Sequence, residues 1–77
     1  MINYENGLRI VRQLYKSGGV NSQEIYDIAY MEEPTNKSLR VGLLSYIIDW
    51  AESGTTEEHQ YIFETTAKAL RKMVSED

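Results

Sequence analysis

The chain has no cysteine, and this absence removes two of the devices by which small domains gain stability. A disulfide framework is excluded, and so is a zinc site built from thiolates. The single histidine, His59, cannot hold a metal unless several carboxylates converge on it, so the sequence predicts no metal and no cofactor. Because 77 residues are close to the length at which one core leaves only about 3–5 kcal/mol of net stability, we expect a homodimer that buries additional area.

Long apolar runs are also missing. The longest, Val41 to Ala51, is interrupted by Ser45 and Asp49 and is too short to span a bilayer. The N-terminal segment MINYENG is polar and lacks the apolar centre of a signal peptide. The sequence therefore predicts a cytoplasmic protein with no membrane partner.

Basic residues are in the minority. The chain has 12 acidic and 8 basic residues, which gives a formal net charge of -4. A protein of this charge has little nonspecific attraction for phosphate, and it binds nucleic acid only through a local basic patch.

Strand signals are absent because alternation with period two is never sustained. Glycine and proline are sparse, and we expect them at the breaks between helices. Apolar residues instead recur at helical spacing. We predict one all-α domain over residues 1–77, a helix-turn-helix-like bundle of four helices. Three of them are expected at 4–16, 22–30 and 55–74, and the third in the chain follows a cap at Thr35 or Asn36 and runs to Glu52.

Local signals mark the ends of these helices. Gly18 and Gly19 end the first helix, since glycine adopts the left-handed conformation without steric cost. Pro34 disfavours helical geometry at Glu33 and so predicts a turn at 31–34. The third helix is apolar on most sides, which predicts a central position or an additional subunit interface. The candidate N-caps are Asn3, Asn21 or Ser22, Thr35 or Asn36, and Thr55 or Thr56.

Three segments resemble the start of winged-helix transcriptional regulators. They are LRIVRQLYKSGG, VNSQEIYDIA and TNKSLRVGLLSYIIDWAESG, and the resemblance covers residues 4–54. It implies a helix-turn-helix core of 4–54 whose third helix enters the major groove of DNA. The family continues after Gly54 into a two-stranded wing, whereas residues 55–74 of this chain predict a C-terminal helix.

The first functional hypothesis is a small DNA-binding transcriptional regulator. The N-terminal end of the third helix would then meet base edges and the second helix would contact phosphates. Glu32 and Glu33 lie beside that end and would repel phosphate. The base-contacting candidates are Thr35, Asn36, Lys37, Ser38 and Arg40, the phosphate-contacting candidates are Ser22 and Gln23, and the dimer candidates on the fourth helix are Ile62, Phe63, Leu70 and Met73.

The second hypothesis is an acidic protein-binding accessory module of the inhibitor or phage antirepressor kind. It would use the same scaffold without binding DNA, and its candidate partner-binding residues are Tyr26, Tyr30, Glu32 and Glu33. A gathering of Arg9, Arg12, Lys16, Lys37 and Arg40 on one face would favour DNA. Glu32 and Glu33 among those bases would favour a protein partner.

No catalytic constellation is predicted. Adjacent residues on a helix point about 100° apart, so neither Glu32 and Glu33 nor Glu57 and Glu58 converge on one atom. His59 has no visible nucleophile beside it, and the chain has no glycine motif that would cradle a phosphate. We therefore expect no enzymatic activity.

Overall fold

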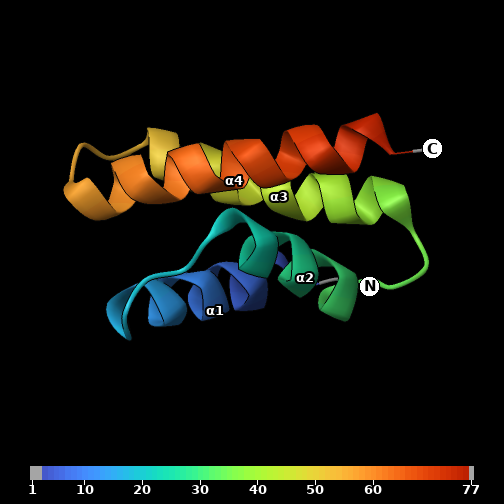
Figure 1. Cartoon of the computed structure of the whole chain (residues 1–77), viewed down its shortest axis with the longest axis horizontal. Coiled ribbons are helices and arrows are strands. Elements are labelled where there is room, and N and C mark those ends of the chain that lie inside the picture. Colours follow the sequence, from blue (N-terminus) through green and yellow to red (C-terminus); the bar gives the residue numbers. More distant parts are fainter. Residues whose placement is uncertain (1–2, 77) are drawn as a thin grey trace.

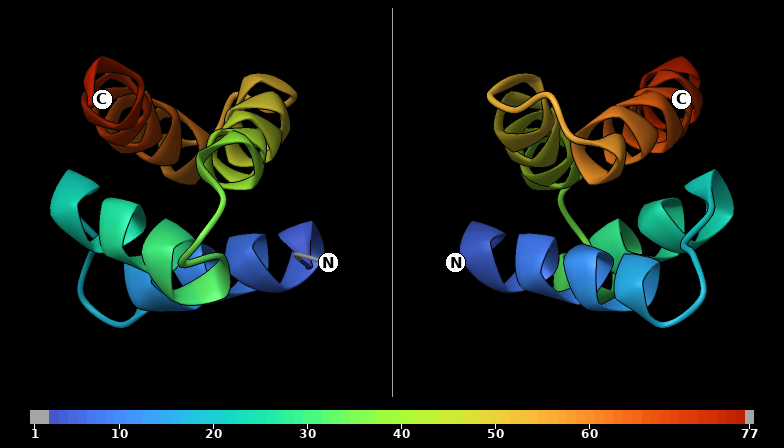
Figure 2. Two further views of the ribbon diagram at one scale, coloured as in Figure 1. Left: turned by 90° about the vertical axis from the view of Figure 1, so that its right-hand side faces the viewer. Right: turned by 90° about the vertical axis from the view of Figure 1, so that its left-hand side faces the viewer.

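A computed structural model of the protein describes residues 3–76, which form four helices in two layers (Figure 1). The helices are α1 (Tyr4–Lys16), α2 (Ser22–Glu32), α3 (Lys37–Glu52) and α4 (Glu57–Ser75). In Figure 2, α3 and α4 lie side by side in one layer, with α3 over α1 and α4 over α2. The predicted all-α bundle of four helices is thereby confirmed.

Each helix begins at a side-chain cap that the sequence predicted. The cap oxygen accepts a hydrogen bond from the backbone N–H three residues further on, at 2.9–3.2 Å. This bond satisfies one of the four N–H groups that a helix start leaves without a partner. The caps are Asn3, Asn21, Asn36 and Thr56.

Two predicted boundaries need correction. Helix α2 runs to Glu32, two residues beyond the predicted end, and only Glu33 is extended, with φ -144° and ψ 89°. The steric effect of Pro34 acts on the residue directly before it, so it ends the helix there and no earlier. Helix α4 begins at Glu57 because Thr56, and not Thr55, is its cap.

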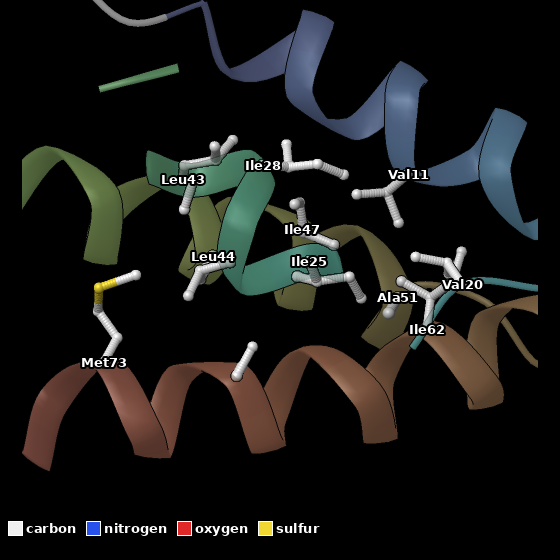
Figure 3. Packing of buried hydrophobic residues seen from close by; sticks show 12 residues of the cluster. Val11, Val20, Ile25, Ile28, Leu43, Leu44, Ile47, Ala51, Ile62 and Met73 are labelled. Atoms are coloured by element: carbon white, nitrogen blue, oxygen red, sulfur yellow. The ribbon is translucent and has the colours of Figure 1, made fainter. Parts of the chain in front are cut away.

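The core lies between the two layers and receives residues from all four helices (Figure 3). Val11, Ile25, Ile47 and Ile62 have no exposed surface. Helix α3 also contributes Leu43, Leu44 and Ala51 to the core, in agreement with the prediction that a helix with apolar residues on most sides is central. Burial of apolar area at about 25 cal/mol per Å² is the main stabilising term in such a fold.

Two glycines lie inside helices rather than at breaks, which corrects the prediction for glycine. A Cβ atom on Gly7 would lie 2.7 Å from Cδ1 of Leu43, and one on Gly42 would meet the hydroxyl of Tyr4. Gly7 belongs to α1 and Gly42 to α3, so each helix has a glycine at the point where a side chain of the other helix packs against it. The close approach of α1 and α3 depends on both positions.

Across residues 3–76, no helix combines the length and the apolar character that crossing a bilayer requires.

Candidate functional site

Arg40, a predicted base-contacting residue, lies inside the protein. Only 8 % of the surface of Arg40 is exposed. Its Nη1 donates a hydrogen bond to the carbonyl oxygen of Glu33 at 3.0 Å, and its guanidinium carbon lies 4.0 Å from the ring centroid of Tyr30. This geometry corrects the expectation that Arg40 faces a DNA groove, because the charge is already used to join α3 to the end of α2.

Lys37 is also engaged within the chain. Its Nζ donates to the carbonyl oxygens of Glu76 and, at 3.5 Å, of Val74. These carbonyls lie at the C-terminal end of α4, where a helix carries partial negative charge and leaves oxygens without intrahelical partners. Lys37 therefore closes the end of α4 instead of standing clear of the surface.

The remaining predicted DNA-contacting residues have mostly local roles. Asn36 caps α3. The backbone N–H and the hydroxyl of Thr35 both donate to Oε1 of Glu33, at 3.2 and 3.0 Å, and these bonds lower the pKa of the Glu33 carboxyl. Gln23 donates to Asp27 and accepts from Lys72, each at 2.9 Å. Ser22 is half-buried, whereas Ser38 is exposed.

The two tyrosines that we considered for a partner-binding surface hold the C-terminal end of α4. The hydroxyls of Tyr26 and Tyr30 both donate to the carboxylate of Glu76, and their ring centroids lie 5.1 Å apart. Nζ of Lys72 lies 4.3 Å from the ring centroid of Tyr26. We call this group, Tyr26, Tyr30, Lys37, Lys72 and Glu76, the C-terminal clamp.

The clamp explains why these tyrosines are poor candidates for binding another protein. Their hydroxyls are already bonded to Glu76, and the bond from Tyr26 is the first cause of the raised pKa of its phenol. Glu32 accepts from Nδ2 of Asn6 at 3.5 Å, and Glu33 accepts from Thr35. All four predicted partner-binding residues are thus half-buried and hydrogen-bonded within their own chain.

The five bases that the DNA hypothesis needs on one face are divided between separate sites. Arg9, Arg12 and Lys16 line an open hollow on α1, while Lys37 and Arg40 make the contacts described above. Arg12 also bridges to Glu58 of α4 at 3.2 Å and lies 4.7 Å from the ring centroid of Trp50. Several basic side chains, Arg12, Lys37 and Arg40, therefore link two helices of the same chain.

A different surface, on α4, is open. Three adjoining hollows lie here, and Gln60, Tyr61, Phe63 and Glu64 each line two of them. Glu52 and Glu57 add carboxylates to the walls. Phe63 is 37 % exposed and Val74 is 58 % exposed, although both are large and apolar. We define the outer face of α4 as Gln60, Phe63, Glu64, Ala67, Leu70, Arg71 and Val74.

The sequence pattern of α4 did not distinguish the residues of this outer face from the residues of the core. Of the four predicted dimer residues, Ile62 and Met73 have no exposed surface and are packed within their own chain, which removes them from any dimer contact in this fold. Phe63 is exposed, and Leu70 is half-buried at the edge of the core. Because the apolar arc of α4 is wide, only the position of its neighbours separates the inward part from the outward part.

The start of α4 is held firmly beneath this face. The ring of His59 stacks on Trp50 with centroids 4.0 Å apart and planes 19° apart. Its Nδ1 lies 2.6 Å from the hydroxyl oxygen of Thr56, which also accepts a hydrogen bond from the backbone N–H of His59. Rigid support of this kind favours a surface that binds without rearrangement.

Within the described part of the chain, no three His, Asp or Glu side chains come together in a way that could hold a metal ion. Comparison of the chain with protein-family models, with curated proteins and with solved structures gave no match.

Proposed function

We propose that this protein is a protein-binding accessory module, and that the outer face of α4 is the surface on which another protein chain docks. The observation that carries this proposal is the exposure of Phe63 and Val74, two large apolar residues on a helix whose residues Ile62, Ala69 and Met73 are buried. An exposed apolar patch with charged residues around it is a common mark of a protein interface.

The charges support a protein partner over DNA. Binding to a duplex depends on bases that neutralise phosphates. In this protein Arg12 pairs with Glu58, Lys37 binds the end of α4, and Arg40 is buried. The net charge of -4 adds a general repulsion of phosphate.

The composition of the outer face also suits a protein partner. Phe63 supplies an aromatic group of the kind that anchors interfaces, and Arg71 supplies a planar cation. The open hollow along this part of α4 is lined by Phe63, Glu64, Ala67, Lys68 and Arg71 among others. Both signs of charge thus border an apolar centre, and this selects a partner of matching pattern.

A photo-crosslinking amino acid placed at position 63 tests this proposal. In extracts of the source cells, we expect it to give a defined crosslinked protein, and a purified sample of that protein should bind the wild-type chain at least tenfold more tightly than the Phe63→Asp variant. The matched control carries the same amino acid at position 27 on α2, where Asp27 is exposed on another face. Equal crosslinking from both positions would contradict the proposal.

Titration of random-sequence duplex DNA at about 50 and about 200 mM salt tests the DNA-binding hypothesis directly. We expect no micromolar binding at either salt concentration. Binding at the lower concentration that is lost in Lys37→Ala would overturn the protein-binding proposal in favour of a regulator.

A further inference from the structure

Helix α4 carries two parallel rows of residues at coiled-coil spacing. The buried row is Ile62, Thr66, Ala69 and Met73, at intervals of four, three and four, and it faces the core of its own chain. The second row is Gln60, Phe63, Ala67, Leu70 and Val74, at intervals of three, four, three and four. Alternating intervals of three and four form the seam along which two helices pack against each other.

This outer seam is left open by the chain itself. Gln60, Phe63 and Val74 are exposed, and Ala67 and Leu70 are half-buried. The seam runs from Gln60 to Val74, which corresponds to about 21 Å at 1.5 Å per residue, so it offers about four helical turns to a partner. The partner that matches it best is therefore another helix of comparable length.

The charges beside the seam identify the partner. Glu64 and Arg71 each follow a seam residue directly, and they are seven residues apart on one side of the helix. In an antiparallel pair of two α4 helices centred near Ala67, Glu64 of each copy lies beside Arg71 of the other. In a parallel pair these two positions lie on opposite sides of the seam and do not meet, so only the antiparallel pair brings Glu64 of one copy beside Arg71 of the other.

The ends and the centre of α4 also suit an antiparallel arrangement. Glu57 in the first turn is exposed, whereas Glu58 and Lys72 are engaged within their own chain by Arg12 and Gln23. Antiparallel packing opposes the two helix dipoles, so the positive N-terminal end of each helix lies beside the negative C-terminal end of the other. Ala67 lies in the wall of the open hollow on α4, and its small side chain permits close approach at the centre.

We infer that the outer face of α4 binds α4 of a second copy of this chain, antiparallel, with a two-fold axis near Ala67. This inference depends on the proposed function, since it names the occupant of the same surface. The monomer exposes 4705 Å², and a standard interface takes about 800 Å² from each partner. In a two-fold interface, a residue away from the axis that contacts residue j of the partner is matched by j contacting its equivalent, as the Glu64 and Arg71 positions require.

Sedimentation velocity of the full chain, in the wild type and in charge-reversed variants, tests the inference. We expect the wild type to be dimeric at tens of micromolar. Glu64→Arg places two arginines beside each other across the axis, and Arg71→Glu places two glutamates there, so each variant should weaken the dimer at least tenfold. An equimolar mixture of the two variants restores both opposite-charge pairs and should return to the dimeric sedimentation coefficient.

The matched control is Asp49→Arg, which makes the same change of charge at an exposed position of α3 and should remain dimeric. Circular dichroism establishes that each variant is folded. A monomeric wild type at 200 µM, a dimer that persists in both single variants, or a mixture that stays monomeric would each overturn the antiparallel self-association.

The two proposals fail in different ways. If the wild type is monomeric but position 63 crosslinks to a different protein, the second copy is wrong and the protein-binding role stands. If position 63 crosslinks to nothing and the chain binds DNA at low salt, both are wrong. A crosslink between two copies of this chain that disappears in Glu64→Arg supports both.

Discussion

The guanidinium of Arg40 lies over the ring of Tyr30, with 4.0 Å between its central carbon and the ring centroid. The same group donates to the carbonyl oxygen of Glu33. These two contacts join the first turn of α3 to the end of α2. A residue whose position in the sequence suggested contact with DNA therefore stabilises the turn between the two helices.

Replacement of Arg40 should lower stability. Arg40→Ala removes a largely desolvated cation–π contact and leaves the carbonyl of Glu33 without its donor, so we expect the free energy of unfolding to fall by about 2 kcal/mol. Urea denaturation followed by circular dichroism measures this change. Ser38→Ala, at an exposed position in the same turn of α3, is the control and should shift the midpoint little. A fully stable Arg40→Ala variant would show that the contact contributes nothing to folding.

The two helical glycines should respond differently to alanine. In an exposed helix this substitution stabilises by about 1 kcal/mol. At Gly7 the new methyl group would press on Leu43, which is fully buried, so we expect Gly7→Ala to destabilise by about 1–3 kcal/mol through overpacking. At Gly42 it would meet only the outer end of Tyr4, which is half-buried and can turn aside. Gly42→Ala should therefore cost less, and equal urea midpoints for the two variants would contradict this ordering.

Thr66 is a site where substitution should increase stability. Its hydroxyl oxygen is buried and has no hydrogen-bond partner among the residues that the structure describes. Valine has nearly the same shape and carries no hydroxyl, so Thr66→Val should raise the free energy of unfolding by about 1 kcal/mol. The control is Thr65→Val, because the Thr65 hydroxyl donates to the carbonyl of Tyr61 at 2.9 Å and its loss should give no gain. Thermal unfolding of the two variants distinguishes these outcomes, and a lower melting temperature for Thr66→Val would be the contrary result.

The C-terminal clamp predicts a dependence of stability on alkaline pH. The hydrogen bond from Tyr26 to Glu76 raises the pKa of the Tyr26 phenol above its unfolded value of about 10. A group whose pKa is raised by folding contributes its full stability below the unfolded pKa and loses it as the pH rises through the folded pKa. We therefore expect one of the six tyrosines to ionise above the others when absorbance at 295 nm is followed.

Glu76→Ala tests the origin of this effect. It removes the acceptor of both clamp tyrosines, so the late ionisation step should move back toward the others, and the loss of stability between pH 10 and higher pH should become smaller. Glu24→Ala, on α2 and outside the clamp, should leave the titration unchanged. A late step that survives in Glu76→Ala would assign the raised pKa to another cause.

Much of the local structure could be predicted because it depends on neighbours in the chain. The limits of α1, the cap at Asn3 and the break at Gly18 and Gly19 follow from hydrogen bonds and backbone angles within about four residues. Gly18 and Gly19 have φ values of 139° and 100°, which few other residues adopt. The end of α2 was placed two residues early because Pro34 constrains only the residue before it.

Sequence patterns were thus enough to predict the four helices, one or two candidate caps for each of them, and the wide apolar arc of α4. Only the tertiary structure decided which apolar and charged side chains remain available to a partner. Ile62 and Phe63 are adjacent in the chain, yet the first is in the core and the second is exposed, because the helices packed against α4 cover one part of its apolar arc and leave the other part open. Arg40 and Lys37 were drawn away from the surface by groups on α2 and α4, and the exposure of a side chain depends on such distant elements rather than on its sequence neighbours.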